Sequence, residues 1–443
     1  MGSMRRVKLG DVALVEISGV DKKSNEGEVS VRLCNYTDVY KNWAITSSMH
    51  DSFMGASANE REIAKFSLHR GQVAVTKDSE TRDDIGIPTY IADNFDDVIL
   101  GYHCALITPD ETQLNGKYLN AFLHTDFIHK FFSANASGSG QRYTLSIETL
   151  NSIPIYLPSL EEQERIGNIF SSIDRKIELN RQINDYLSAM ARQLYDYWFL
   201  QFDFPNEKGK PYKTSGGKMV WNEKLKKEIP EGWTVQPLGR LLSKLSSGNR
   251  PSGGINKSLK AGIPSLGAEC IDSLGVYDYK STPYIPEKYK DYLRNGIIDN
   301  NDILVYKDGA YVGKTTLFRD GFPFSFAAVN EHVFLLHARD EYMQEYILYS
   351  LLLPTYFELM QMSGKAKAAQ PGLNQEDIRS LSIVVPNKQT LQDFSNEIIT
   401  LHKRLFGNSL ASAKLLELKE ELIPVLMNGQ VSVRQLNNHL SHD

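Results

Sequence analysis

The chain has 443 residues, of which 41% are hydrophobic and 23% charged, and this composition predicts an ordinary globular protein of two or three domains. Its three cysteines (Cys34, Cys104 and Cys270) lie far apart, and we find no signal peptide and no run of about 18 apolar residues, so we expect a cytoplasmic protein with no disulfide framework, zinc site or membrane contact. The formal net charge of −5 argues mildly against a nucleic-acid-binding protein but does not exclude one, because an acidic surface elsewhere can coexist with two basic faces.

An internal repeat organises the chain. The segment ETLNSIPIYLP at 148–158 aligns with EDIRSLSIVVP at 376–386, and Pro386 follows Pro158 by 228 positions. Both segments alternate apolar residues before the proline, which predicts a half-buried strand in each copy. Two upstream pairs also match: GQVAVTKD at 71–78 with NDILVYKD at 301–308, and Leu9-Gly10 with Leu238-Gly239.

The repeat predicts an α+β protein in which two similar domains are joined by two long helices. The predicted parts, in chain order, are a domain at 1–158, a helix at 159–200, a linker at 201–232, a second domain at 233–386, a second helix at 387–428 and a tail at 429–443.

Residues 159–200 have the features of a long helix. They contain no proline, and Ser159 with Glu162 makes a capping box at the start. About 40 residues would span roughly 60 Å at ~1.5 Å per residue. Apolar residues alternate spacings of four and three, the period of a left-handed coiled coil. The predicted seam is Ile166, Phe170, Ile173, Ile177, Asn180, Leu187 and Leu194 in the first helix, and Phe394, Ile398, Leu401, Leu405, Asn408, Leu415 and Leu422 in the second.

Polar residues interrupt both seams at the same place, at Asn180 with Asn184 and at Asn408 with Ser412. A buried polar residue in a seam costs stability and fixes register. The shared interruption favours two helices packed on each other, antiparallel if the domains are related by a pseudo-twofold axis. The alternative is that each helix packs only on its own domain. Outside the polar pair, Lys419 breaks the apolar trend, and we expect Pro424 to kink or end the second helix.

The segments at 157–182 (LPSLEEQERIGNIFSSIDRKIELNRQ) and 194–233 (LYDYWFLQFDFPNEKGKPYKTSGGKMVWNEKLKKEIPEGW) resemble the central conserved region of the specificity subunits of type I restriction-modification systems. As an order of variable domain, conserved helix, variable domain and conserved helix, the resemblance covers nearly the whole chain. PNKQTLQDFSNEI, which begins at Pro386, is a looser match to the second conserved region.

The resemblance implies a role for each part. Each variable domain would be a target recognition domain that reads half of a split site in double-stranded DNA. The two long helices would form an antiparallel coiled coil that sets the spacer. Two modification subunits would dock on the chain, bind S-adenosylmethionine and methylate adenines. Restriction subunits would add translocation and cleavage driven by ATP with magnesium. The chain itself would bind no cofactor and no metal.

Catalytic motifs are missing or incomplete. The tetrapeptide [DN]PP[YF], with which amino-methyltransferases hold an exocyclic nitrogen, does not occur. DGAYVGKTT at 308–316 resembles a Walker loop, but one residue is missing between Gly309 and Gly313, and the sequence that follows does not predict a helix. We expect a turn between two strands there, from which Tyr311 and Lys314 could also reach DNA.

Two loops stand just before the matched strands and carry polar residues suited to DNA. Lys and Arg neutralise phosphates, while Arg, Lys, Asn and Gln read base edges. The loops at 137–146, expected to be flexible, and 363–374 could equally be solvated connectors. The candidate DNA-binding residues are Gln141, Arg142, Tyr143, Arg32 and Lys41 in the first copy, and Asn249, Arg250, Tyr311, Lys314, Lys365, Lys367 and Gln370 in the second.

The leading hypothesis is a non-catalytic DNA-recognition subunit that scaffolds modification and restriction subunits. One alternative is a duplicated scaffold that recruits proteins without reading sequence, which the net negative charge favours. The second alternative is a nuclease or methyltransferase that acts alone, and the missing catalytic motifs argue against it. The aromatic residues that end the first helix are expected to be core or to contact a modification subunit: Tyr195, Tyr197, Trp198 and Phe199.

Overall fold

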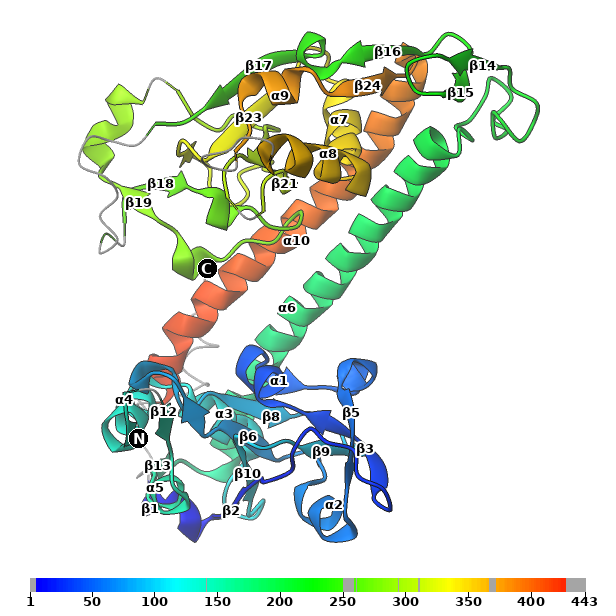
Figure 1. Ribbon diagram of the computed structural model, residues 1–443. Helices are drawn as coiled ribbons and strands as arrows, with labels where there is room; N and C mark the ends of the chain where they lie inside the picture. The colour runs from blue at the N-terminus through cyan, green and yellow to red at the C-terminus, as the bar shows by residue number, and fades with distance from the viewer. Residues whose placement is uncertain are drawn as a thin grey trace. The chain divides into compact units, whose positions relative to one another are not determined.

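The computed structural model describes residues 5–140, 142–249, 259, 261–293, 295–309, 311–365 and 372–427. The chain divides into two compact units, one made of 1–178 with 414–443 and the other of 179–413. Two long helices, α6 (Leu160–Tyr195) and α10 (Lys388–Met427), contribute a segment to each unit (Figure 1). None of the described helices is at once long and apolar enough to span a lipid bilayer.

The first unit is built on a five-stranded sheet. Its strands, in spatial order, are β2 (Ala13–Ile17), β10 (Cys104–Pro109), β6 (Val73–Thr76), β8 (Pro88–Ile91) and β4 (Ala44–Ile45), and only the edge pair β8–β4 is parallel. Smaller sheets are formed by β5 (Met54–Ala58), β3 (Val29–Cys34) and β9 (Val98–Leu100), by β11 (Ser137–Ser139), β12 (Arg142–Thr144) and β7 (Asp78–Ser79), and by β1 (Arg5–Lys8) with β13 (Pro154–Leu157).

The central strand β6 explains why this unit has two cores. All of its residues are buried, and successive side chains point to opposite faces of a strand. Val73 and Val75 accordingly join a core that includes Phe170 of α6, whereas Ala74 joins a second core on the other face. The short helices that cover these cores are α1 (Tyr36–Lys41), α2 (Glu60–Phe66), α3 (Gly116–Leu123), α4 (Asp126–Asn135) and α5 (Ile147–Asn151).

The second unit repeats the central part of this arrangement. Its main sheet has the order β17 (Leu242–Ser247), β23 (Val333–Ala338), β20 (Ile303–Tyr306) and β21 (Thr315–Leu317). Its helices are α7 (Met343–Leu351), α8 (Pro354–Lys365) and α9 (Gln375–Arg379). The remaining sheets are β19 (Tyr284–Ile285), β18 (Ile263–Leu266) and β22 (Ala328–Val329), then β16 (Thr234–Pro237) with β24 (Ser382–Val385), and the hairpin β14 (Met219–Asn222) with β15 (Lys227–Pro230).

The predicted duplication is confirmed by equivalent hydrogen bonds. β1 pairs with β13 so that Arg5 faces Leu157, and β16 pairs with β24 so that Thr234 faces Val385. The residue after each first strand then donates its backbone N–H to the segment before the second strand. Leu9 bonds the carbonyl of Ile153 at 2.8 Å, and Leu238 bonds that of Leu381 at 2.7 Å.

The matching Leu-Gly pairs mark a close approach in both units. A Cβ added to Gly10 would lie 2.8 Å from Asn151 Oδ1, and one added to Gly239 would lie 2.9 Å from Arg379 Cβ. Asn151 and Arg379 end α5 and α9. Only glycine leaves room for these short helices to sit against the turn after the first strand.

Within the second unit, α6 and α10 contact each other in an antiparallel arrangement. Asn180 Nδ2 lies 3.1 Å from Ser412 Oγ, and Asn184 Nδ2 lies 3.1 Å from the Leu405 carbonyl oxygen. Asn408 Nδ2 donates to Asn184 Oδ1 at 3.1 Å. Higher numbers on α6 thus meet lower numbers on α10, and the fold class expected from the sequence is confirmed.

The seam positions differ in how deeply they are buried. Ile166, Phe170 and Ile173 are buried in the first unit, as are Asn180, Leu187, Phe394, Ile398 and Leu405 in the second, whereas Ile177, Leu194, Leu401, Asn408, Leu415 and Leu422 are half-buried.

Two seam irregularities have local explanations. Lys419 is buried in the first unit, where its Nζ lies 3.3 Å from the centre of the Trp43 ring and 3.7 Å from Asp174 Oδ1. The aromatic face and the carboxylate replace the apolar partner that a seam usually offers. Pro424 does not end the second helix, because α10 continues to Met427, and a kink at this residue stays a prediction. Proline removes the N–H that would bond the carbonyl four residues earlier, but only three residues of α10 follow Pro424, so little of the helix lies beyond the lost bond.

A buried polar network fastens α10 to the rest of the second unit. Arg319 Nη2 lies 2.6 Å from Glu345 Oε1, and Ser395 Oγ donates to Glu345 Oε2 at 2.9 Å. On the next turns of α10, His402 lies 3.2 Å from Arg319 Nη1 and 2.9 Å from the hydroxyl of Tyr349. Every charge in the network therefore has a partner, as burial requires.

Acid should destabilise the second unit through His402. Burial, with the neighbouring Arg319, lowers the pKa of His402 from 6.5 to about 3. The unfolded chain therefore binds a proton that the folded chain excludes, so stability is full above pH 6.5 and is lost as the pH falls toward 3. Denaturant titrations between pH 7 and 4 should show a loss approaching about 1 kcal/mol per pH unit from this group. His402→Gln should remove that part of the slope, and the exposed control His69→Gln should retain it; equal slopes in all three proteins would contradict this assignment.

Candidate functional site

In the first unit, one carboxylate gathers three basic side chains beside the candidate loop 137–146. Asp78 begins β7, directly after the buried strand β6. Its Oδ2 lies 2.5 Å from His103 Nδ1, 2.9 Å from Lys77 Nζ and 3.2 Å from Arg142 Nη2. The loop was expected to be flexible, but it contains the hairpin β11–β12, whose second strand pairs with β7.

The second unit places the same residue types at the equivalent position. His332 Nδ1 lies 3.1 Å from Asp308 Oδ2, and Lys307 Nζ lies 3.9 Å from the same oxygen. The backbone frame is also shared, because the lysine N–H donates to the histidine carbonyl at 2.9 Å in both units, from Lys77 to His103 and from Lys307 to His332. We call these two groups the Lys-Asp-His clusters.

The cluster in the first unit is the more tightly built. Burial alone would raise the pKa of Asp78, but hydrogen bonds from Thr144, His103 and Lys77 outweigh it and hold that pKa far below the usual range. Only 9% of the Asp78 side chain is exposed, against 23% for Asp308. His103 also adopts the left-handed backbone conformation, with φ of 69°, which is uncommon for a residue other than glycine. Such backbone strain is often found at functional sites.

The structure places the candidate DNA-binding residues in different surroundings. Arg142 and Tyr143 lie on β12, and the guanidinium of Arg82 sits 5.0 Å from the centre of the Tyr143 ring. Arg32 is half-buried on β3, where its Nη1 bonds two backbone carbonyls, so it has little freedom to read a base. Exposed positions are occupied by Lys41, Asn249, Tyr311 and Lys365. Gln141, Arg250, Lys367 and Gln370 lie outside the described residues.

The segment that resembles a Walker loop is a turn between strands, as predicted. β21 follows Gly313 and pairs antiparallel with β20. Lys314 at this turn forms an ion pair with Asp272 at 3.2 Å. The turn packs on α8, since Gln361 Nε2 donates to the Val312 carbonyl at 2.6 Å. Tyr311, Lys314 and the end of α8 are thus parts of one region of the second unit.

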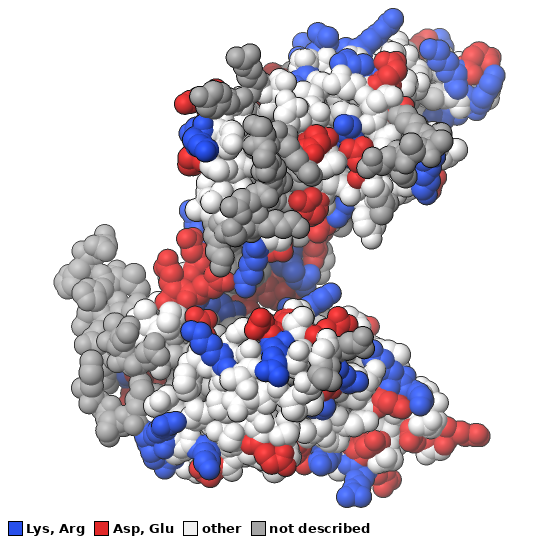
Figure 2. Space-filling view, turned by 60° about the vertical axis from the view of Figure 1, so that its left-hand side comes forward, with Lys and Arg blue, Asp and Glu red and all other residues white. Residues whose placement is uncertain are grey.

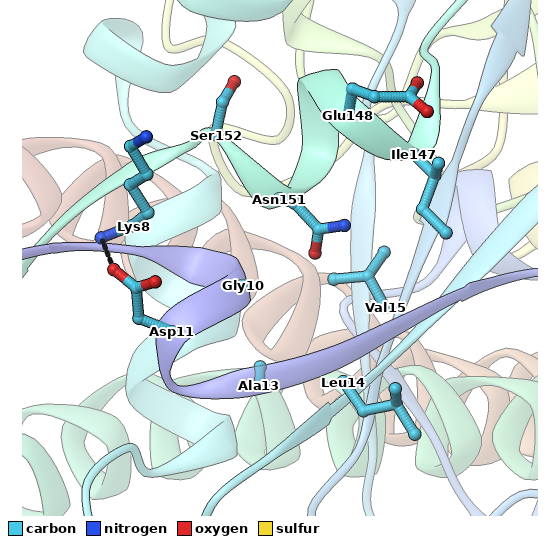
Figure 3. Close-up of a pocket in the computed structure, with 10 residues that line it drawn as sticks. All are labelled: Lys8, Gly10, Asp11, Ala13, Leu14, Val15, Ile147, Glu148, Asn151 and Ser152. Atoms are coloured by element: carbon cyan, nitrogen blue, oxygen red, sulfur yellow. Dashed lines mark hydrogen bonds between the residues drawn. The ribbon is translucent and has the colours of Figure 1, made fainter.

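Other candidate sites have less to offer chemically. Among the described residues, no group of three or more His, Cys, Asp or Glu is arranged to hold a metal ion. An open depression of about 580 Å³ in the first unit is lined mainly by the turn at Gly10, by β2 and by α5, with the Asn151 side chain pointing toward the turn (Figure 3). Of its two acidic residues, Asp11 already accepts the backbone N–H of Lys8 at 3.1 Å, and the other is Glu148. The rest of the lining mixes the apolar side chains of Leu14, Val15 and Ile147 with polar ones, and it does not gather the polar groups at one point.

Surface charge alone would not have located the site. On the faces visible in Figure 2, Lys and Arg side chains are interspersed with Asp and Glu on both units. The Lys-Asp-His clusters were also missed as a site, although the sequence held a signal. TKD at 76–78 and YKD at 306–308 end equivalent strands, and a histidine follows each aspartate 25 and 24 residues later.

Comparison with known proteins identifies relatives along most of the chain. A family model described as the type I restriction modification DNA specificity domain matches residues 3–189 and 230–406. The type I restriction enzyme MjaIX specificity subunit of Methanocaldococcus jannaschii is 27% identical over 332 residues, 72% of this chain and 70% of that protein. The HindI specificity subunit of Haemophilus influenzae is 20% identical over 429 residues, 83% of this chain and 88% of that protein. The crystal structure of a type I restriction-modification S subunit from M. genitalium shares the fold, with a TM-score of 0.56 and 13% identity over 96% of each chain.

The two clusters should differ in what they contribute to stability. Asp78→Asn replaces a buried acceptor of charged hydrogen bonds, so the free energy of unfolding should fall by about 1–3 kcal/mol. Asp308→Asn should cost less, because Asp308 is more exposed and its contacts are longer. The control Asp51→Asn changes a fully exposed side chain and should shift stability by less than about 0.5 kcal/mol. Urea unfolding of the three variants provides the comparison, and an equal loss at Asp78 and Asp308 would show that the clusters are equally tight.

Proposed function

Because this chain belongs to the family of type I restriction-modification specificity subunits, which recognise DNA sequence, we propose that each of its two units reads one half of a two-part target in double-stranded DNA. The observation that carries the proposal is the second Lys-Asp-His cluster, which has the same backbone frame as the first. One chain that presents the same kind of polar surface twice is suited to two separate half-sites. Sequence-specific binding then needs only side chains that differ between the copies.

The chain is a recognition subunit and not an enzyme, and we infer that partner subunits carry the catalysis. Two modification subunits would supply S-adenosylmethionine and methylate adenines within the target. Restriction subunits would supply ATP-driven translocation and magnesium-dependent cleavage. We place the assembled complex in the cytoplasm, where its DNA substrate lies and where its described cysteines, which are free and buried, would stay reduced.

We infer that the paired helices set the spacer between the half-sites. The polar contacts of Asn180 and Asn184 fix one register of α6 against α10 in the second unit, and Asp174 with Lys419 fixes it in the first. When the register is fixed, the number of residues in the helix pair sets its length, since each helical residue adds ~1.5 Å.

The exposed face of α6 offers a docking surface for a modification subunit. Leu179, Ile183, Tyr186 and Met190 are exposed on α6 in the second unit, and 73% of Tyr186 is accessible. Their spacing of four, three and four is that of a coiled-coil seam, and it lies outside the seam that faces α10. A continuous exposed apolar stripe on a soluble helix marks an interaction site. The occupant we propose is an amphipathic helix of the modification subunit.

Binding by the complex of this chain with its modification subunits tests the proposed function. The target motif is first obtained by sequencing the methylated bases of a host that expresses the complex. Duplexes that carry this motif should bind at least about 10³-fold more tightly than random duplexes at physiological salt. Equal affinity for both would instead support the duplicated protein-recruiting scaffold, which the net charge of −5 favours.

Lengthening the helix pair should change the spacer and leave the half-sites as they are. Seven residues inserted between Ile177 and Asn180 in α6, and seven between Ser412 and Leu415 in α10, keep the seam in phase. The added ~10 Å corresponds to at most about three base pairs at ~3.4 Å each. Methylated-base sequencing should therefore show the same half-sites with a longer spacer. The same insertion in the exposed turn Glu207–Gly209 serves as the control and should leave the spacer unaltered, whereas an unchanged spacer in the helix variant would reject the proposal.

A charge placed in the exposed stripe should block assembly. Met190→Glu puts a carboxylate where an apolar contact with the modification subunit is proposed, so the fraction of assembled complex at micromolar concentration should fall at least tenfold. Arg192→Gln makes the same change in net charge at an exposed position on another face of α6 and should assemble normally. Mass photometry of the mixed subunits measures both. Normal assembly of Met190→Glu would exclude this face as the docking surface.

A further inference from the structure

The guanidinium of Arg142 contacts protein groups through one nitrogen, and the rest of the side chain is largely exposed to solvent. Its Nη2 donates to Asp78 Oδ2 at 3.2 Å and lies against the ring of His103, whose Nδ1 donates to the same carboxylate oxygen. Both partners are anchored, because Asp78 is almost fully buried and also bonds Lys77. Nevertheless 61% of the Arg142 side chain is exposed, and among the described residues no other group bonds its Nη1 or Nε. The side chain is therefore fixed in direction and still has donors directed to solvent.

The position of Arg142 suits the major groove. It begins β12, the second strand of the hairpin formed with β11, and the major groove admits a two-stranded β-ribbon. Gly138 allows the two strands to approach closely, since a Cβ there would lie 2.1 Å from the Arg142 carbonyl oxygen. The hairpin is held to the body of the unit by β7, where Tyr143 pairs with Ser79.

The carboxylate behind Arg142 argues for a base contact and against a phosphate contact. Asp78 is ionised and lies within hydrogen-bonding distance of the guanidinium, so it offsets part of the positive charge that Arg142 and Lys77 together would present to a phosphate. The Asp78 carboxylate also restricts the conformations of the Arg142 side chain. Such restriction favours a contact in which two donors must meet two acceptors in a fixed geometry. Guanine presents such a pair of acceptors, O6 and N7, in the major groove.

The internal repeat shows which residues around Arg142 are the same in both copies and which residue differs. Thr144 faces Asp78 across β12 and β7, and Gly372 faces Asp308 in the second unit. Lysine, aspartate and histidine are kept in both copies, whereas the position two residues before the facing residue is Arg142 in one copy and Gln370 in the other. Gln370 lies outside the described residues. Two domains that read different sequences are expected to keep the residues that position a base contact and to differ at the residue that makes it.

We propose that Arg142 reads a guanine in the half-site bound by the first unit and that Asp78 and His103 are positioning residues that aim its guanidinium. The proposal rests on the proposed function and adds to it a named base and a named side chain. It also gives the cluster in the first unit a role beyond stability.

The test uses the complete complex of this chain with its modification subunits and a duplex library in which each position of the target is varied in turn. For wild type, one guanine·cytosine pair of one half-site should be required, with every substitution there weakening binding about 5- to 150-fold. Arg142→Gln should lose that requirement at this pair alone. Asp78→Asn, which keeps the arginine, should weaken the same requirement and no other. Arg61→Gln, an exposed arginine on α2, is the matched control and should leave the recognised sequence as in wild type.

Each other outcome is decisive. If Arg142→Gln weakens binding to all duplexes equally and lowers the salt dependence by about one phosphate contact, Arg142 binds the backbone and the proposal is wrong. An unchanged profile for Arg142→Gln would also overturn it. If Asp78→Asn lowers affinity for every duplex alike, Asp78 has only a structural role, and the positioning part fails. A wild-type complex without any sequence preference would instead refute the proposed function itself.

Discussion

The antiparallel contact between α6 and α10 is the interaction on which the remaining structure depends. It is specified by a polar layer within an apolar seam. Asn180 is only 2% exposed, and its Nδ2 lies 3.1 Å from Ser412 Oγ and 3.4 Å from the Asn408 carbonyl oxygen. Buried amides are stable only where their hydrogen bonds are satisfied, so sliding one helix past the other would leave these groups unpaired. The layer therefore selects one register, whatever its net effect on stability.

The same principle extends to both units through polar groups that each helix presents to its own surroundings. In the first unit, Lys419 of α10 is enclosed by Trp43 and Asp174. In the second unit, His402 of α10 is enclosed by Arg319 and Tyr349. These contacts tie α10 to residues far away in the sequence, and they join the duplicated domains to the helices that the proposed function uses as a spacer.

Features of the fold that recur periodically along the sequence could be predicted, whereas features that depend on packing between distant residues could not. The seam, the polar layer and the repeated strand before each proline recur at fixed spacing, and the structure contains them. The burial of Lys419 could not be predicted, because the Trp43 that covers it is distant in sequence. The segment 201–232 was expected to be a linker, but it contains the β14–β15 hairpin and Phe204, which stacks on Trp233 with ring centres 5.1 Å apart. Packing among aromatic side chains leaves no periodic signal.

In the candidate site, too, local sequence features could be predicted and contacts between distant residues could not. The loop with Arg142 was identified from its polar composition and its place before the repeated strand. The hairpin within it and the carboxylate behind it depend on pairing with β7, and Asp78 is 64 residues from Arg142. Arg32, a candidate chosen by residue type alone, is instead held by backbone carbonyls. Residue type indicates what a side chain is able to bind, but only its neighbours decide whether it is free to do so.

The register of α6 against α10 can be measured directly by cross-linking. The variant Asn180→Cys/Ser412→Cys should form a disulfide under mild oxidation, because the two side chains meet in the polar layer. Asn180→Cys/Leu405→Cys is the matched control, since Leu405 lies seven residues, about 10 Å, along α10 from Ser412. Peptide mapping should find the first cross-link in high yield and little of the second. Efficient cross-linking of the second pair without the first would contradict the register and, with it, the account of the helix pair.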